Sequence, residues 1–204
     1  MSFLDMTTNE FIAELASKNS VPGGGGAAAV AGAMGAALAA MVCNLTVGKQ
    51  KYAHVEEDVQ KILSRVDVLK NELLQMADED AKCFEPLANA YKIPKDDPKR
   101  DEIMEQALRT ACTAPLKIIH AGEETLELLG ELVEKGSVLA LSDVGCGASM
   151  CRSAVMSAWI SVKINTRDMK DREYALKLED EVDDIIEHSR MVGDKIYDKV
   201  LRKL

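Results

Sequence analysis

The stretch SVPGGGGAAAVAGAMGAALAAMVCNLTVG, residues 20–48, decides the fold of this chain. It contains no charged residue, and from residue 27 onward most of its side chains are small or apolar. The length of residues 27–48 matches the roughly 20 residues that a helix needs to cross a bilayer. It lacks, however, the flanking aromatic residues and the high Leu, Ile and Phe content that favour insertion. We therefore predict a buried central helix over residues 27–48, with a membrane span as the alternative.

Small side chains recur along one side of this predicted helix. Ala28, Gly32, Ala36 and Ala40 are each four residues apart, so they lie above one another on the helix surface. Side chains of this size let neighbouring backbones approach closely. The pattern predicts tight helix packing, either within the protomer or across a dimer interface.

The rest of the chain also carries helical patterns. Apolar residues recur at spacings of three and four, and neither sustained alternation nor an Asn-Gly or Asp-Gly turn indicates a strand. Thr7 and Glu10 form a capping-box pattern, Pro115 must kink or split its helix, and Gly136 is a typical helix stop. We expect an all-α, single-domain bundle (residues 1–204) of about five to seven long, partly kinked helices, including helices over residues 8–18, 52–91, 99–136, 150–164 and 170–204.

Length and charge exclude several classes of protein. A chain of 204 residues is long enough for one sizeable core and too short to expect two independent domains. It carries 34 acidic and 25 basic side chains, a formal net charge of −9, and only 4% aromatic residues. Phosphate backbones are repelled by such a charge, and few rings are present to stack on bases. We expect no nucleic-acid partner.

The cysteines indicate a reducing compartment. Their number is five, which is odd, no CxxC spacing occurs, and the N-terminus MSFLDMTTNEF lacks the pattern of a secretory signal. The three histidines are far apart and share no metal-ligand spacing with the cysteines. We predict reduced thiols, a cytoplasmic protein and no metal site.

Two segments interrupt the helical pattern and are candidates for chemistry. The first comprises Pro22, Gly23, Gly24, Gly25 and Gly26, which we expect to be non-helical. Glycines before a helix expose amide donors and allow a ligand to approach closely. The other interpretation is a tight corner that lets the following helix pack, and the local sequence favours neither.

The second segment begins at Ser142 and Asp143, which we expect to cap the helix over residues 150–164. An acid at that position is a cap or a catalytic group. Asp78 and Asp80 are two residues apart on a predicted helix, so at most one of them points inward. A carboxyl group on the apolar side would have a raised pKa, which suits a general acid or base.

The residues of these segments resemble one known family. The run from Ser20 to Gly25, the small-residue helix, and the stretch LTVGKQKY ending at Tyr52 resemble the opening of the formiminotetrahydrofolate cyclodeaminase and methenyltetrahydrofolate cyclohydrolase family. Further similarities follow in order over nearly the whole chain: DEDA with Phe84, QALR with Pro115, SDVG and finally Ile164-Asn165. The family loop usually reads PGGGS, and Gly26 stands at the place of the serine.

The resemblance implies an all-helical homodimer without metal or redox cofactor that acts on a tetrahydrofolate derivative. The implied reactions are closure of 5-formimino-tetrahydrofolate to 5,10-methenyl-tetrahydrofolate with release of ammonia, or hydrolysis of the methenyl bridge to 10-formyl-tetrahydrofolate. A non-catalytic dimer that binds folate or a partner protein is the alternative. The hypothesis takes Asp143 or Asp80 as the acid or base, and its substrate-binding residues are Pro22, Gly23, Gly24, Gly25, Lys49, Lys51, Ser142 and Asn165. The lysines would hold the glutamate tail.

Overall fold

The computed structural model describes residues 2–204, and no strand occurs among them. The chain folds into seven α-helices joined by short turns and three short 3-10 helices, which confirms the all-α prediction. The elements are η1 (Phe3–Asp5), α1 (Thr8–Leu15), α2 (Gly24–Asn44), η2 (Gln50–Val55), α3 (Glu56–Ala90), α4 (Arg100–Ala111), α5 (Thr113–Lys135), η3 (Val138–Ala140), α6 (Leu141–Asp168) and α7 (Arg172–Lys203).

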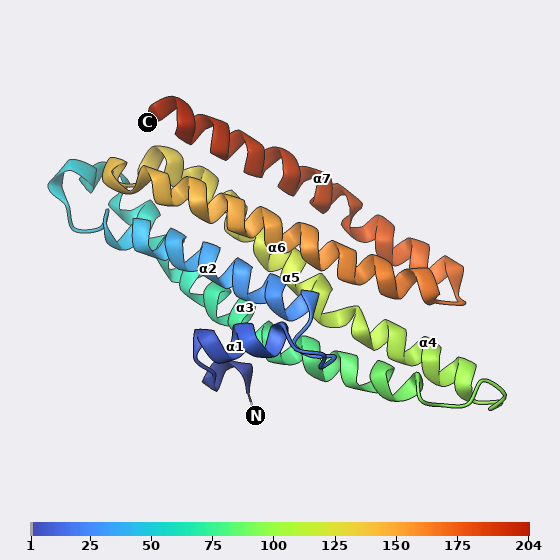
Figure 1. The fold of residues 1–204 in the computed structure, drawn as a ribbon. Coiled ribbons are helices and arrows are strands. Elements are labelled where there is room, and N and C mark those ends of the chain that lie inside the picture. The colour runs from blue at the N-terminus through green and yellow to red at the C-terminus, as the bar shows by residue number, and fades with distance from the viewer. Residues whose placement is uncertain (1) are drawn as a thin grey trace.

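The long helices run along one common direction, with α7 on one edge of the bundle and α3 with α4 on the other (Figure 1). Helices α2 and α6 are antiparallel neighbours. A Cβ atom built on Gly24 would lie 3.9 Å from the Ser161 hydroxyl, and one on Gly35 would lie 2.4 Å from Cys151 Sγ. The close approach at Gly35 requires a residue without a side chain, whereas the contact between Gly24 and Ser161 has an ordinary distance. The prediction of tight packing by small residues is confirmed within the protomer.

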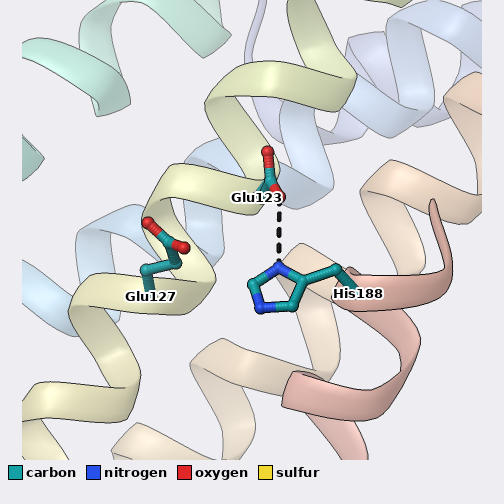
Figure 2. Close-up of side chains that lie close together, drawn as sticks. All are labelled: Glu123, Glu127 and His188. Carbon is teal, nitrogen blue, oxygen red and sulfur yellow. Dashed lines mark hydrogen bonds and ion pairs between the residues drawn. The ribbon is translucent and has the colours of Figure 1, made fainter. Parts of the chain in front are cut away.

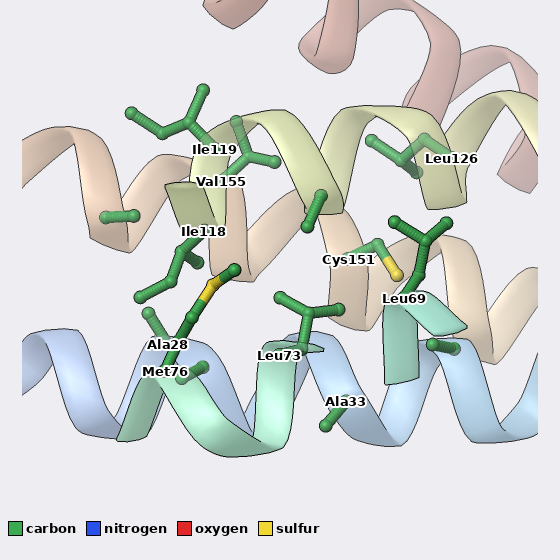
Figure 3. Close-up of a cluster of buried hydrophobic side chains, with 14 of the residues drawn as sticks. Ala28, Ala33, Leu69, Leu73, Met76, Ile118, Ile119, Leu126, Cys151 and Val155 are labelled. Atoms are coloured by element: carbon green, nitrogen blue, oxygen red, sulfur yellow. The ribbon is translucent and has the colours of Figure 1, made fainter. Parts of the chain in front are cut away.

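Helices α3 and α5 pack on the same side of the α2–α6 pair. Leu73 of α3 packs against Gly32 of α2, and Val155 of α6 packs against Gly122 of α5. Figure 3 shows the core that results, in which side chains of all four helices interlock. The predicted burial of α2 is confirmed on the sides that face α3, α5 and α6. By length and composition alone, α2 is also apolar enough to cross a membrane.

Several predicted boundaries are confirmed. Thr7 and Glu10 form the capping box of α1 through both reciprocal hydrogen bonds. Gly136 ends α5, and Pro115 lies in the first turn of α5, so the predicted split falls just before it. Proline is favoured there because the first-turn amides of a helix have no partner within the helix.

Two local predictions are wrong. The glycines were expected to be non-helical, but α2 begins at Gly24, so Gly24, Gly25 and Gly26 form its first turn. Ser142 and Asp143 do not cap a helix near residue 150, because α6 begins at Leu141 and both residues lie in its first turn. Gly145 and Gly147, which follow them, are also helical. Glycine is favoured at these positions because neighbouring helices pack closely against them. A Cβ atom on Gly147 would lie 3.1 Å from the Gly35 carbonyl oxygen.

Candidate active site

Asp80 of α3 lies against the first turn of α2. A Cβ atom on Gly25 would be 2.2 Å from Asp80 Oδ1, so the carboxyl group fills the space above this glycine. The N-cap residue, Gly23, offers no side chain to the amides of the turn. The carboxylate of Asp80, which belongs to a different helix, lies close enough to the backbone N–H of Gly26 for this N–H to lower its pKa.

The environment of Asp80 also changes its acidity. Burial raises the pKa of its carboxyl group to about 6, and the N–H of Gly26 opposes part of this rise. A group with such a pKa exists in both protonation states near neutral pH. It can therefore take up and return a proton within one catalytic cycle.

Space around Gly26 is more restricted than at an ordinary surface turn. A Cβ atom there would lie 3.3 Å from Pro22 Cβ, which is closer than most real contacts of this kind. A serine at this position would require Pro22 to shift by a few tenths of an ångström. Glycine stands here in place of the serine that the family loop usually carries, and it fits this position without a shift of Pro22.

Asp78 points to a different place from Asp80. It accepts hydrogen bonds from the hydroxyl of Ser2 and from the backbone N–H of Phe3, the latter at 2.6 Å, and so fastens the N-terminal segment to α3. The prediction that at most one of the two acids faces the central helix is confirmed.

A cavity of about 600 Å³ opens between the N-terminal segment, the turn before α2 and α3. Its wall includes Asp78 and Lys82 of α3 and Lys92 of the turn that follows α3. Sequence reasoning missed these lysines because they read as ordinary solvent-facing residues of an amphipathic helix. These lysines can be recognised as part of a cavity only once the structure places the turn at Ser20 beside them.

Four of the predicted residues lie at the opposite end of α2. Lys49 and Lys51 follow the end of α2 and are exposed, Ser142 is exposed, and Asp143 is half-buried. The Tyr52 hydroxyl accepts a hydrogen bond of 3.1 Å from the backbone N–H of Val138, which ties η2 to the connection before α6. This end therefore has its own small cluster of polar groups.

Helix α2 separates the two groups of predicted residues. It has 21 residues, so its ends are roughly 30 Å apart at 1.5 Å per residue. Asn165 belongs to the Asp80 end, because it lies one turn beyond Ser161, and its side chain is buried beside Cys112. Within one protomer the structure brings Asp80 to the turn of Pro22, Gly23, Gly24 and Gly25 and places Asn165 at the same end of α2. It leaves Lys49, Lys51, Ser142 and Asp143 apart from them.

A third group of side chains has the spacing of metal ligands. Glu123 and Glu127 of α5 and His188 of α7 place one ligand atom each within 4.8 Å of one another (Figure 2). His188 Nδ1 lies 3.1 Å from Glu123 Oε1, so this pair already joins the two helices. None of the predicted site residues lies on α5 or α7, and the group is not part of the candidate active site.

Comparisons with known proteins identify the family of this chain. The family model described as formiminotransferase-cyclodeaminase matches residues 7–184. A methenyltetrahydrofolate cyclohydrolase of Methylorubrum extorquens is 36% identical, and the match covers 97% of both chains. A formimidoyltransferase-cyclodeaminase of Rattus norvegicus is 29% identical over 93% of this chain, which corresponds to only 36% of that longer protein.

A solved structure shows the same fold. The formiminotetrahydrofolate cyclodeaminase of Thermotoga maritima superposes with a TM-score of 0.82 at 27% identity, covering 98% of this chain and 96% of that one. The fold, the family model and the full-length relative agree. This chain belongs to the formiminotransferase-cyclodeaminase family.

Proposed function

We propose that this protein is a folate enzyme that acts on the one-carbon bridge between N5 and N10 of tetrahydrofolate. The leading reaction is hydrolysis of 5,10-methenyl-tetrahydrofolate to 10-formyl-tetrahydrofolate. The observation that carries it is the 36% identity with a methenyltetrahydrofolate cyclohydrolase over 97% of both chains. A non-catalytic folate binder is disfavoured, because the named relatives are enzymes.

Asp80 is the acid–base group in this proposal. Its carboxylate takes a proton from the water that adds to the methenyl carbon. The bond from this carbon to N5 then breaks, Asp80 returns the proton to N5, and the proton of the new hydroxyl group leaves to solvent. A formyl group remains on N10. Proton transfer by a positioned side chain typically contributes roughly 10²–10⁴-fold to the rate.

Cyclisation of 5-formimino-tetrahydrofolate is the second candidate reaction, favoured by the full-length similarity to a cyclodeaminase structure. Here N10 adds to the formimino carbon, and the proton of N10 passes to the formimino nitrogen. Protonated Asp80 donates a further proton to this nitrogen, the bond between the nitrogen and the carbon breaks, and ammonia leaves. The same carboxyl group serves both reactions, since each passes through a tetrahedral carbon and needs a proton moved by an acid or base.

The binding partners follow from the same proposal. The first turn of α2, with Pro22, Gly23, Gly24 and Gly25, lies against the one-carbon bridge or the pterin, and Asn165 lies beyond it. The protein works as a cytoplasmic homodimer, without metal or redox cofactor and without binding nucleic acid or membrane. Cys43, Cys112 and Cys151 are buried free thiols, which agrees with a reducing compartment.

The test is to mix the purified protein with 5,10-methenyl-tetrahydrofolate and to follow the loss of its near-ultraviolet absorbance against a protein-free control. Accelerated loss with 10-formyl-tetrahydrofolate as product supports the hydrolase. No acceleration, together with ammonia release from 5-formimino-tetrahydrofolate, supports the cyclodeaminase. If neither substrate reacts, the proposed function is wrong.

A further inference from the structure

We infer that Glu123 and Glu127 of α5 and His188 of α7 bind one divalent transition-metal ion of the zinc type, which clamps the last helix to the bundle. The site is separate from the proposed active site, where Asp80 of α3 lies against α2. The inference therefore goes beyond the proposed function and does not depend on it. Three observations carry it: the convergence of the ligand atoms, the donor set, and the lack of another cation for the two glutamates.

The three side chains converge from two helices. Glu123 and Glu127 are four residues apart, so they lie one above the other on the same face of α5. His188 projects toward them from α7 (Figure 2), and one ligand atom of each residue lies within 4.8 Å of the other two. Ligand atoms of a tetrahedral zinc site are roughly 3.3 Å apart, because each is about 2.0–2.1 Å from the ion. Rotations of these partly exposed side chains can close the remaining gap.

The donor set suits zinc and similar ions. Two carboxylates and a neutral imidazole carry two negative charges in all, which balance the charge of a divalent cation. Imidazole nitrogen is a common ligand of zinc, whereas calcium and magnesium prefer oxygen ligands. A cavity of about 470 Å³ borders Glu127 and His188, and the His188 side chain is 43% exposed. Water can therefore reach the ion and supply the fourth ligand.

Glu127 distinguishes a metal site from an ordinary pair of side chains. Glu123 Oε1 and His188 Nδ1 are 3.1 Å apart and can form a hydrogen bond by themselves. Glu127, by contrast, makes no ion pair with any of residues 2–204. Its carboxylate nevertheless lies beside the other two ligand groups. Two neighbouring carboxylates repel each other, and a cation between them turns this repulsion into attraction.

The helices are acidic around this place. Residues 123–134 of α5 contain five acidic and no basic residues, and residues 179–187 of α7, directly before His188, contain six acidic and no basic residues. The other three acids of the α5 segment have basic partners: Glu124 pairs with Arg65, Glu131 with Lys135, and Glu134 with Lys199 and Lys203. Glu123 and Glu127 have no Lys or Arg partner among residues 2–204, so a bound cation would supply the missing positive charge.

Spacing in the sequence could not reveal this site. Glu123 and His188 are 65 positions apart, and they meet only because α7 packs on α5. One such contact is at Gly130, where a Cβ atom would lie 3.7 Å from Ile196. The proposed ion replaces the expectation of no metal site for this pair of helices. The proposed reaction at Asp80 still uses no metal.

Zinc binding to the purified protein tests the inference. Bound metal is first removed with a chelator, and zinc chloride is then titrated in by isothermal titration calorimetry. We expect one zinc ion per chain. His188→Gln and Glu127→Gln should each weaken the binding at least about tenfold, because each removes one of three ligands.

Two matched controls use the same kinds of substitution. His54→Gln changes an exposed histidine of η2, and Glu187→Gln changes an exposed acid next to His188 that pairs with Arg190. Both variants should bind zinc as tightly as the wild type. Cobalt(II) in place of zinc should give a spectrum without the charge-transfer band of thiolate ligands, since no cysteine belongs to the site.

Thermal unfolding provides the independent measurement. Zinc at about 100 times its Kd should raise the Tm of the wild type by about 5–10 °C, because an ion that binds only the folded state stabilises it. Glu127→Gln should unfold at the wild-type temperature without zinc, since the contact of His188 with Glu123 remains. Its Tm should not rise at the same zinc concentration, and its circular dichroism should match that of the wild type.

Several results would overturn the inference. The wild type could bind no zinc, or His188→Gln and Glu127→Gln could bind it as tightly as the wild type. A thiolate band in the cobalt spectrum would show that cysteines hold the ion instead. Calcium or magnesium binding as tight as that of zinc would contradict the assigned class of metal.

Discussion

The carboxyl group of Asp80 occupies the space that a side chain at Gly25 would need. All three of its outer atoms lie within 2.6 Å of the position of a Cβ atom on Gly25. The glycine run before α2 is thus more than a flexible turn, because at least one of its members is required by an acid 55 positions away in the chain. This contact connects the sequence motif to the proposed chemistry.

Gly25→Ala should therefore inactivate the protein without unfolding it. The added methyl group forces the Asp80 carboxyl group away from the first turn of α2, and we expect a loss of kcat on the order of 10²-fold. Gly130→Ala is the control, since its Cβ atom would meet Ile196 at an ordinary 3.7 Å. That variant should keep its activity and gain up to about 1 kcal/mol of stability from the better helix propensity. Steady-state kinetics and urea unfolding compare the two, and equal activities would remove Gly25 from the site.

The raised pKa of Asp80 predicts a pH-dependent stability difference. The group has a pKa of about 6 in the folded protein and 3.8 in the unfolded chain, so the folded state holds its proton more tightly. Burial of Asp80 therefore costs stability progressively as pH rises from about 4 to 6, and the cost is constant above that. Asp80→Asn removes this cost, at most about 3 kcal/mol at pH 7 for a difference of this size. Urea unfolding between pH 4 and 8 measures it.

Glu134→Gln is the control of opposite sign. Hydrogen bonds and ion pairs with Lys199 and Lys203 lower the pKa of Glu134 to about 2. The stabilisation that the Glu134 carboxylate provides is fully present above pH 4.5 and is lost as pH falls toward 2. Glu134→Gln should therefore lower the free energy of unfolding at neutral pH. If Asp80→Asn instead lowers stability at pH 7 and raises it at pH 4, the assignment of the buried carboxyl group is wrong.

The same pKa sets the pH profile of activity. In the hydrolysis reaction the carboxylate form of Asp80 accepts the proton of water, so kcat should fall tenfold per pH unit below about 6. In the cyclisation reaction the protonated form donates, and kcat should fall above about pH 6. The profile of the wild type with each substrate measures this. A flat profile between pH 5 and 8 would exclude Asp80 as the group that moves the proton.

The sequence predicted the fold better than the site, for physical reasons. Helical periodicity, the capping box at Thr7 and the break at Pro115 are local signals, and local contacts produced those elements. The start of α6 was misjudged because Gly145 and Gly147 disfavour a helix in isolation, whereas the packing of Gly147 on Gly35 favours it. Tertiary contacts of this kind leave no mark in a single sequence.

The sequence indicated candidate residues of the site but not their arrangement. The spacing of Asp78 and Asp80 predicted that at most one of these acids points inward, without deciding which, and the structure places Asp80 against Gly25. The separation of Lys51 and Asp143 from Asp80 depends on the antiparallel course of α2 and α6, which no motif encodes. The lysines of the cavity, Lys82 and Lys92, became candidates only through the folded position of the turn at Ser20.

The buried cysteines should be chemically silent in the native protein. Burial raises the pKa of the thiols of Cys43, Cys112 and Cys151 to about 12, and the thiolate is the reactive form. We expect all three to resist iodoacetamide at pH 8 and to react once the protein is unfolded in urea, as read by mass spectrometry of the peptides. Rapid labelling of any of the three in the native state would show that the core opens readily.

Removal of the lysines after α2 tests where the folate tail lies. Lys49 and Lys51 are exposed and form no ion pair with the described residues 2–204, so their charges are available to substrate carboxylates. Lys49→Ala and Lys51→Ala should raise KM by several-fold with little change in kcat, because tail contacts are equally strong in the ground and transition states. Lys61→Ala makes the same change of net charge at an exposed residue already paired with Glu57, and its KM should stay at the wild-type value. The KM increase should grow with added glutamates and disappear with a substrate that lacks the tail. An unchanged KM in both variants would move the tail to the cavity lined by Lys82 and Lys92, where the same substitutions can be repeated.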